Sequence, residues 1–126
     1  MKCVTEWIGR CIHWQFSGII TADTVIEVIS GLYGHERFDD TRAQIRDFRD
    51  ITLADPSIER VQTIAAFDRA AALSNPNMRV AVVTTEHLDH QMLTSLYCAE
   101  LDGTSWEVKM FHCLEAAKGW ATEVAR

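Results

Sequence analysis

Residues 79–85, with the sequence RVAVVTT, form the only continuous apolar strand pattern in this chain. A strand of this kind has no polar face, so other elements must cover both of its sides, as helices do in parallel sheets. The turn-forming residues Ser74-Asn75-Pro76-Asn77 precede it and end a helical segment. The pattern therefore predicts a strand at the centre of a sheet, with both of its faces covered.

Four other segments carry apolar residues at helical spacing. Residues 22–33 follow Thr21, which suits an N-cap, and precede Gly34, which suits the C′ position. Further helices are predicted for residues 56–73 and 87–100. A last helix presents one apolar stripe, made of Leu114, Ala117, Ala121 and Val124.

Four further segments have strand patterns. Residues 2–8 and 11–17 predict a hairpin, because Gly9-Arg10 between them suits a two-residue turn. Residues 43–53 predict another strand. From residue 106 to residue 110, apolar and charged residues alternate, which indicates an edge strand.

The predicted hairpin has one apolar face. Pairing of Ile8 with Cys11 sets Glu6 opposite His13 on the other face, and we interpret these two residues as an exposed pair. The apolar face should meet the core. It is formed by Cys3, Thr5, Trp7, Ile12, Trp14 and Phe16.

The predicted elements follow the order β-β-α-β-α-β-α-β-α, with about five strands and four helices. Repeated β-α alternation predicts right-handed crossovers and a largely parallel sheet, opened by an antiparallel hairpin. The length of 126 residues suits a single α/β domain, residues 1–126. Ligands of such sheets bind at the carboxyl ends of the strands. That edge comprises residues 53–57, 84–87 and 111–113.

Composition and motifs argue against several classes of function. The chain has 12 basic and 18 acidic residues, a net charge of −6 and no basic cluster, so we expect no nucleic-acid partner. No apolar run is long enough for a membrane or typical of a signal peptide. Four widely spaced cysteines without a Cys-x-x-Cys pair suit reduced thiols, so we expect a cytoplasmic protein. No cofactor is expected, because no ligand motif is matched.

Charged residues interrupt the strand predicted for residues 43–53. They are Arg46, Asp47, Arg49 and Asp50. Charges within a strand of a parallel sheet must be paired, exposed on an uncovered face, or functional. We interpret Asp47, Arg49 and Asp50 as an Asp–Arg network that braces the loop.

Three segments carry a family resemblance: DFRDI at residues 47–51, NPNMRVAVVTT at residues 75–85 and WEVKMFHCLEAAKGWA at residues 106–121. Through them, most of the chain resembles the bacterial STAS superfamily, the fold of the sporulation anti-sigma-factor antagonists, and its SpoIIAA-like or STAS/SEC14 relatives. The resemblance implies one SpoIIAA-like domain. It also implies a cytoplasmic, non-enzymatic module that regulates or binds another protein, or a carrier of a small apolar or lipid-like ligand.

The resemblance singles out Asp55-Pro56-Ser57-Ile58. In the antagonists, the third strand leads into an Asp-Ser-Ser-Gly motif, one serine of which is phosphorylated by a partner kinase. Asp55 and Ser57 agree with this motif, whereas the other two residues differ. Ser57 is thus the candidate phospho-acceptor. Together with Glu86 and His87 on the same sheet edge, Asp55 and Ser57 form the candidate interaction edge for a protein partner.

The same residues also form a good helix start. Asp55 suits an N-cap, Pro56 the first helical position and Ser57 the second. A serine in the first turn of a helix can also carry a phosphoryl group, which the free N–H groups stabilise. The sequence leaves both interpretations open.

Several aromatic residues have two interpretations as well. Trp7, Trp14, Phe16 and Trp106 can pack in the core, or they can line a pocket for an apolar ligand. The edge strand around Trp106 and the hairpin leave pairing with a second copy open, so a homodimer is an alternative to a monomer.

Histidines near the third helix suggest a third hypothesis, a metal- or cysteine-dependent enzyme. His87 and His90 lie three residues apart, which can place two metal ligands on one helix face. A third ligand would come from His112 or Cys113. The alternative is a solvated helix start, and no metal is assigned because no ligand motif is matched.

Overall fold

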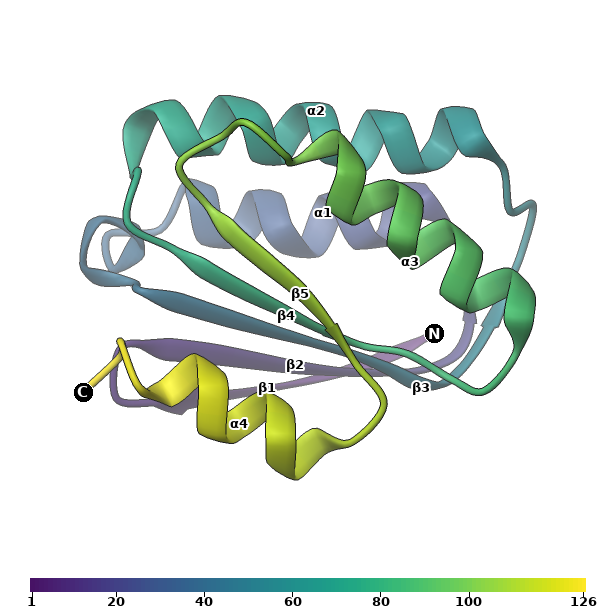
Figure 1. Ribbon diagram of the computed structural model, residues 1–126, viewed down its shortest axis with the longest axis horizontal. Helices are drawn as coiled ribbons and strands as arrows, with labels where there is room; N and C mark the ends of the chain where they lie inside the picture. The colour runs from purple at the N-terminus through teal and green to yellow at the C-terminus, as the bar shows by residue number, and fades with distance from the viewer.

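The computed structural model describes residues 1–126 as a five-stranded mixed sheet with helices on both faces (Figure 1). Its strands are β1 (Lys2–Ile8), β2 (Cys11–Ile20), β3 (Ala43–Leu53), β4 (Arg79–Val83) and β5 (Glu107–Phe111), and they lie in the order β1-β2-β3-β4-β5. β1 and β2 are antiparallel, whereas all other neighbouring strands are parallel. The predicted α/β class with an N-terminal hairpin is therefore confirmed.

The helices cover the two faces of the sheet unequally. α1 (Ala22–Tyr33), α2 (Ile58–Ser74) and α3 (Leu88–Glu100) lie on one face, and α4 (Leu114–Thr122) lies on the other (Figure 1). A short 3-10 helix, Phe38–Asp40, precedes β3. None of the helices combines the length and the apolar character needed to cross a membrane.

β4 is covered on both faces, as its apolar run predicts. Val80 and Val82 lie in the core beneath α1, α2 and α3, whereas Ala81 and Val83 pack with α4. The predicted central position is wrong, because β3 is the middle strand of the sheet. An apolar strand needs elements that cover both of its faces, but it need not be the middle strand. β4 lies next to the edge strand, and α4 covers its second face there.

The hairpin has the predicted register, in which Trp7 pairs with Ile12 on the apolar face. Its turn depends on Gly9, which has a φ of +59°. A Cβ at Gly9 would lie 2.6 Å from the carbonyl oxygen of Ala125. Glycine permits this close approach, so the N–H of Arg10 donates to the same oxygen at 2.8 Å and fixes the C-terminal segment to the hairpin.

His13 departs from the sequence-based interpretation. It pairs with Glu6 as predicted, but it is not exposed: only 6% of the residue is accessible. Neither ring nitrogen has a hydrogen-bond partner. The prediction of an exposed pair is wrong because His13 lies on the α4 side of the sheet, where Asp47 of β3 and Lys118 of α4 are its charged neighbours.

Candidate functional site

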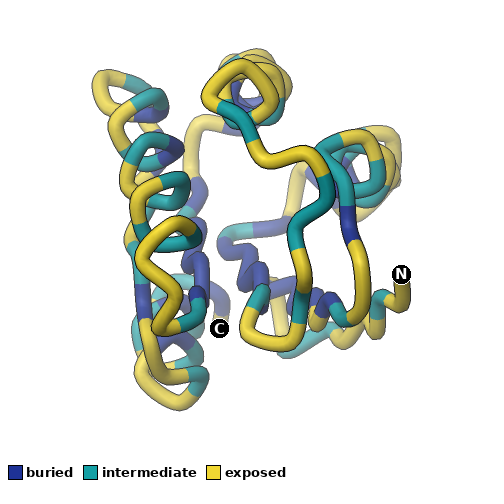
Figure 2. Tube along the Cα trace, turned by 90° about the vertical axis from the view of Figure 1, so that its right-hand side faces the viewer, coloured by how far each residue is buried: buried dark blue, intermediate teal, exposed yellow.

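A cavity of about 110 Å³ lies at the carboxyl end of the sheet, beneath α1, α2 and α3. Most of its wall is apolar, with Val25 from α1, Ile51 from β3, Val61 from α2 and Leu93 from α3 among the lining residues. Figure 2 shows the molecule from this end, where the loops and first helical turns are largely exposed. Ligands of open α/β sheets bind at this edge, so the cavity is the candidate functional site.

The loop between β3 and α2 forms part of the cavity wall, with Asp55, Pro56 and Ser57 among the lining residues. Asp55 has a φ of +53°, in the left-handed region. Its carboxylate accepts a hydrogen bond from Nη2 of Arg60 at 3.2 Å. Two residues of the predicted interaction edge therefore border the cavity.

Ser57, not Asp55, is the N-cap of α2. The Ser57 hydroxyl accepts the backbone N–H of Arg60 at 3.1 Å, and the helix begins at Ile58. The predicted order of Asp55 as N-cap and Pro56 as first helical residue is wrong. The left-handed backbone at Asp55 turns the chain before Pro56, which moves the cap two residues along.

Replacing Ser57 by alanine is expected to lower the free energy of unfolding by about 1 kcal/mol, because the first turn of α2 loses its cap. Ser57→Asp should retain most of that stability, because aspartate is an equally good cap. Urea denaturation measures both changes. Ser74→Ala, at the other end of α2, is the control and should change stability by less than about 0.5 kcal/mol. Equal stability of Ser57→Ala and wild type would contradict the capping role.

The other half of the predicted edge lies outside the cavity wall. Glu86 and His87 are exposed, and neither lines the cavity. His87 precedes α3 and makes no side-chain cap; its backbone N–H donates to Oγ1 of Thr85 at 3.1 Å. The predicted edge is thus divided between the cavity wall and the adjacent surface.

His90, in the first turn of α3, does line the cavity. Its Nδ1 lies 2.9 Å from Oγ1 of Thr85. Burial lowers the pKa of His90, and the nearby His87 lowers it further. The two imidazole rings lie 5.3 Å apart between centroids, but no third histidine, cysteine or carboxylate completes a group of three ligands. His112 and Cys113 are exposed between β5 and α4.

The four aromatic residues considered for a pocket do not line this cavity. Trp14, Phe16 and Trp106 are buried in the core beneath the three helices. Trp106 also donates from Nε1 to the backbone oxygen of Asn75 at 2.7 Å. Trp7 is half-buried. The cavity is lined mainly by aliphatic residues instead, and its aromatic members are Phe48 and Tyr97.

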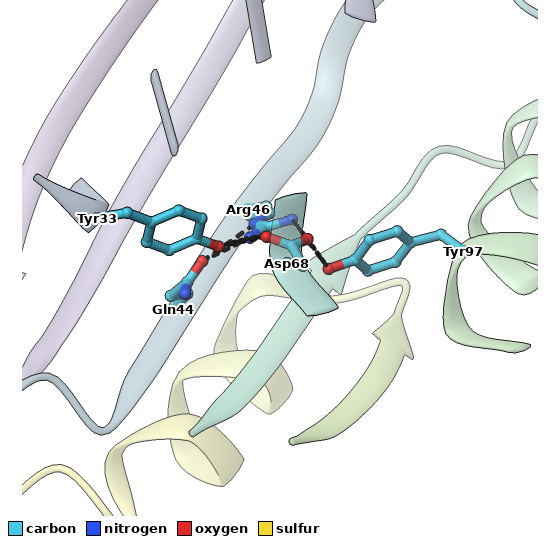
Figure 3. Close-up of polar contacts among 5 residues, drawn as sticks. All are labelled: Tyr33, Gln44, Arg46, Asp68 and Tyr97. Carbon is cyan, nitrogen blue, oxygen red and sulfur yellow. Dashed lines mark hydrogen bonds and ion pairs between the residues drawn. The ribbon is translucent and has the colours of Figure 1, made fainter. Parts of the chain in front are cut away.

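A buried ion pair lies beside the cavity. Arg46 of β3 is 1% exposed and Asp68 of α2 is 0% exposed. Nη1 of Arg46 lies 2.8 Å from Oδ2 of Asp68, and Nη2 lies 3.0 Å from Oδ1, so the contact is bidentate (Figure 3). Such a planar pair is the geometry in which arginine binds a carboxylate most strongly.

Three polar side chains complete this network. The hydroxyls of Tyr33 and Tyr97 both hydrogen-bond to the Asp68 carboxylate, and Oε1 of Gln44 accepts from Nη2 of Arg46 at 2.7 Å (Figure 3). Burial raises the pKa of both tyrosines, so the hydroxyls stay protonated and donate. Burial disfavours the charge of Arg46, but Asp68 and the tyrosines raise its pKa above the ordinary value.

The sequence-based interpretation of the charged strand is right that an aspartate and an arginine pair, but this pair lies within β3 and does not brace the loop, and a second pair was missed. Arg49 donates from Nη2 to Oδ2 of the buried Asp47 at 2.9 Å, whereas Asp50 is exposed. Arg46 pairs with Asp68, a helix residue that the sequence did not single out. Its signal is its position: Asp68 lies three residues after Ala65 and four before Ala72, on the buried stripe of α2.

Comparison with known proteins leaves the site to be interpreted from its own chemistry. No protein-family model, curated protein or solved structure matches this chain. The site consists of an apolar cavity, a wall that includes Arg46 and Tyr97, and a loop that ends in the Ser57 cap. A cavity with mostly apolar walls and a few placed polar groups is suited to enclosing and orienting a small molecule.

Proposed function

We propose that this protein binds a small, mainly apolar molecule in the cavity beneath α1, α2 and α3. The observation that carries the proposal is the cavity itself, about 110 Å³ with a largely aliphatic wall. A dry apolar cavity of about 150 Å³ is known to bind benzene. The size therefore suits a molecule with about one ring, bound as by a carrier or a sensor rather than converted by an enzyme.

The energetics of the cavity support this proposal. The cavity is open to solvent at the sheet edge, so water contacts part of its apolar wall. A ligand that covers this wall removes apolar surface from water, which is favourable by roughly 25 cal/mol per Å², and it gains van der Waals contacts with the wall. The four cysteines are free, which supports our proposal of a cytoplasmic location.

The proposal is tested by filling the cavity from one wall. Methylenecyclohexane, a one-ring hydrocarbon, should bind wild type and shift the NMR signals of lining residues. Val61→Phe should weaken that binding at least about tenfold, because the added ring occupies the ligand volume. Leu73→Phe is the matched control on the same helix, because Leu73 is 89% exposed. No binding to wild type, or equal binding to Val61→Phe, would contradict the proposal.

A second candidate function is a STAS-like regulatory or protein-interaction module that uses the same edge. Large, exposed apolar side chains in the first two turns of α2 and α3 favour it. Ile58 of α2 is 61% exposed, and Leu88 and Met92 of α3 are 69% and 61% exposed. A protein partner would bury these side chains. A phosphoserine at Ser57 would interrupt such a contact, so a partner that binds wild type should be lost with Ser57→Asp and with Leu88→Glu.

A further inference from the structure

Most polar side chains of the cavity wall already have partners within the chain. Arg46 and Tyr97 belong to the Asp68 network. The hydroxyl of Thr94 donates to the backbone oxygen of His90 at 2.9 Å. Ser57 caps α2.

Two lining side chains have hydrogen-bonding capacity left over. The hydroxyl of Thr84 has no partner in the chain, although only 4% of the residue is exposed. It follows Val82 and Val83 at the end of β4, on the face that carries the cavity. The second is His90, of which only Nδ1 has a partner.

The contacts of Thr85 determine which nitrogen of His90 carries the proton. Oγ1 of Thr85 accepts the backbone N–H of His87 at 3.1 Å, and its own proton has His90 Nδ1 as acceptor at 2.9 Å. The backbone N–H of His87 and the hydroxyl of Thr85 are both used as donors when Nδ1 of His90 is an acceptor. The proton of the neutral ring then lies on Nε2. Because burial lowers the pKa of His90, the ring is neutral near pH 7. His90, which lines the cavity, therefore carries one N–H donor, at Nε2, that has no partner in the chain.

We infer that the cavity selects neutral molecules that carry a hydrogen-bond acceptor, in particular a carbonyl oxygen, which Nε2–H of His90 and the hydroxyl of Thr84 bind. This inference rests on the proposed function and adds a ligand class to it. The two donors come from adjacent segments, the end of β4 and the first turn of α3. The apolar body of the ligand contacts the aliphatic walls supplied by β3, α1 and α2.

The charges around the cavity favour a neutral ligand over an anion. Nη2 of Arg60 lies 3.2 Å from Asp55, and its Nη1 lies 3.9 Å from Asp23. Arg46 is paired with Asp68. Both arginines of the wall thus have carboxylate partners, so a carboxylate ligand would lose its hydration without gaining a free cation.

Two probes of nearly equal shape test the inference. Cyclohexanone carries a carbonyl oxygen where methylenecyclohexane carries a CH₂ group. His90→Asn retains a polar group near the position of Nδ1 for Thr85 but lacks the Nε2 donor, and Thr84→Val removes the hydroxyl with little change of shape. Each variant should weaken cyclohexanone binding by about threefold to tenfold, the effect of one hydrogen bond. Methylenecyclohexane binding should change by less than about twofold.

His112→Asn is the matched control, since His112 is an exposed histidine outside the cavity wall and should leave both affinities unchanged. Equal losses for both probes would show that Thr84 and His90 act only through packing, and the inference would be wrong while the proposed function stands. Unchanged cyclohexanone binding by both variants would also overturn it, as would tighter binding of cyclohexanecarboxylate than of cyclohexanone. Failure of wild type to bind either probe would instead refute the proposed function.

Discussion

Replacing Asp68 by asparagine is expected to lower the free energy of unfolding by about 3–5 kcal/mol. The change leaves the guanidinium of Arg46 buried at 1% exposure without a counter-charge. It also weakens the acceptor for two tyrosine hydroxyls. A small domain has a total stability of about 5–15 kcal/mol, so this single substitution should remove a large part of it.

A double variant without either charge and a variant of a partly exposed ion pair serve as comparisons for Asp68→Asn. Arg46→Met combined with Asp68→Leu should be clearly more stable than Asp68→Asn, because no charge is left unpaired. Glu100→Gln removes the partner of the partly exposed Arg69 and should cost about 1 kcal/mol or less. Urea denaturation followed by tryptophan fluorescence measures all three. A loss below about 1 kcal/mol for Asp68→Asn would show that the buried pair contributes little.

The Asp68 network also explains how the cavity stays open. Its members come from the three helices above the site and from the middle strand: Tyr33 from α1, Asp68 from α2, Tyr97 from α3 and Arg46 from β3 (Figure 3). These hydrogen bonds have fixed lengths and directions, whereas apolar contacts alone are non-directional. The network therefore holds the three helices at a defined spacing on the sheet, which prevents the aliphatic walls from collapsing into the cavity.

Local signals in the sequence predicted much of the fold. α1 has the predicted bounds because Thr21 forms a capping box with Thr24 and the following apolar residues recur at helical spacing. β3 spans the predicted residues 43–53. The start of α2 differs because the left-handed backbone of Asp55 is decided by the loop that joins β3 to α2, and nothing in the sequence of that loop distinguishes it from a direct helix start.

Features that depend on partners distant in sequence were harder to predict. Strand order is one of them. The apolar composition of a strand indicates that both of its faces are covered, but it does not indicate which strands lie beside it. β4 was therefore predicted at the central position that β3 occupies. The Arg46–Asp68 pair spans 22 residues, and only the combination of a charged strand with an acid on a buried helix stripe points to it. The cavity left no periodic signal, since its wall combines residues from the sheet and three helices.

His13 is a buried imidazole without hydrogen-bond partners, which lowers the free energy of unfolding, so its replacement should have a large effect on stability. Both ring nitrogens lack hydrogen bonds, and each unsatisfied buried group costs about 1–3 kcal/mol. Leucine has a similar volume and no polar atoms. His13→Leu is therefore expected to raise the free energy of unfolding at pH 7 by about 1–3 kcal/mol, measured by urea denaturation. A destabilised variant would mean that His13 has polar partners in solution.

The advantage of His13→Leu should grow in acid. Burial lowers the pKa of His13 below the ordinary value of 6.5, and Lys118 and Arg49 act in the same direction, while Asp47 and Glu6 oppose them. The unfolded chain therefore binds the proton more readily than the folded chain. Wild type should lose stability as the pH falls below 6.5 and through the folded pKa, whereas the variant lacks this loss. His90, whose pKa is also lowered, is present in both proteins, so its contribution cancels in the difference. A constant difference between wild type and His13→Leu from pH 7 to pH 5 would contradict the assignment of this acid sensitivity to His13.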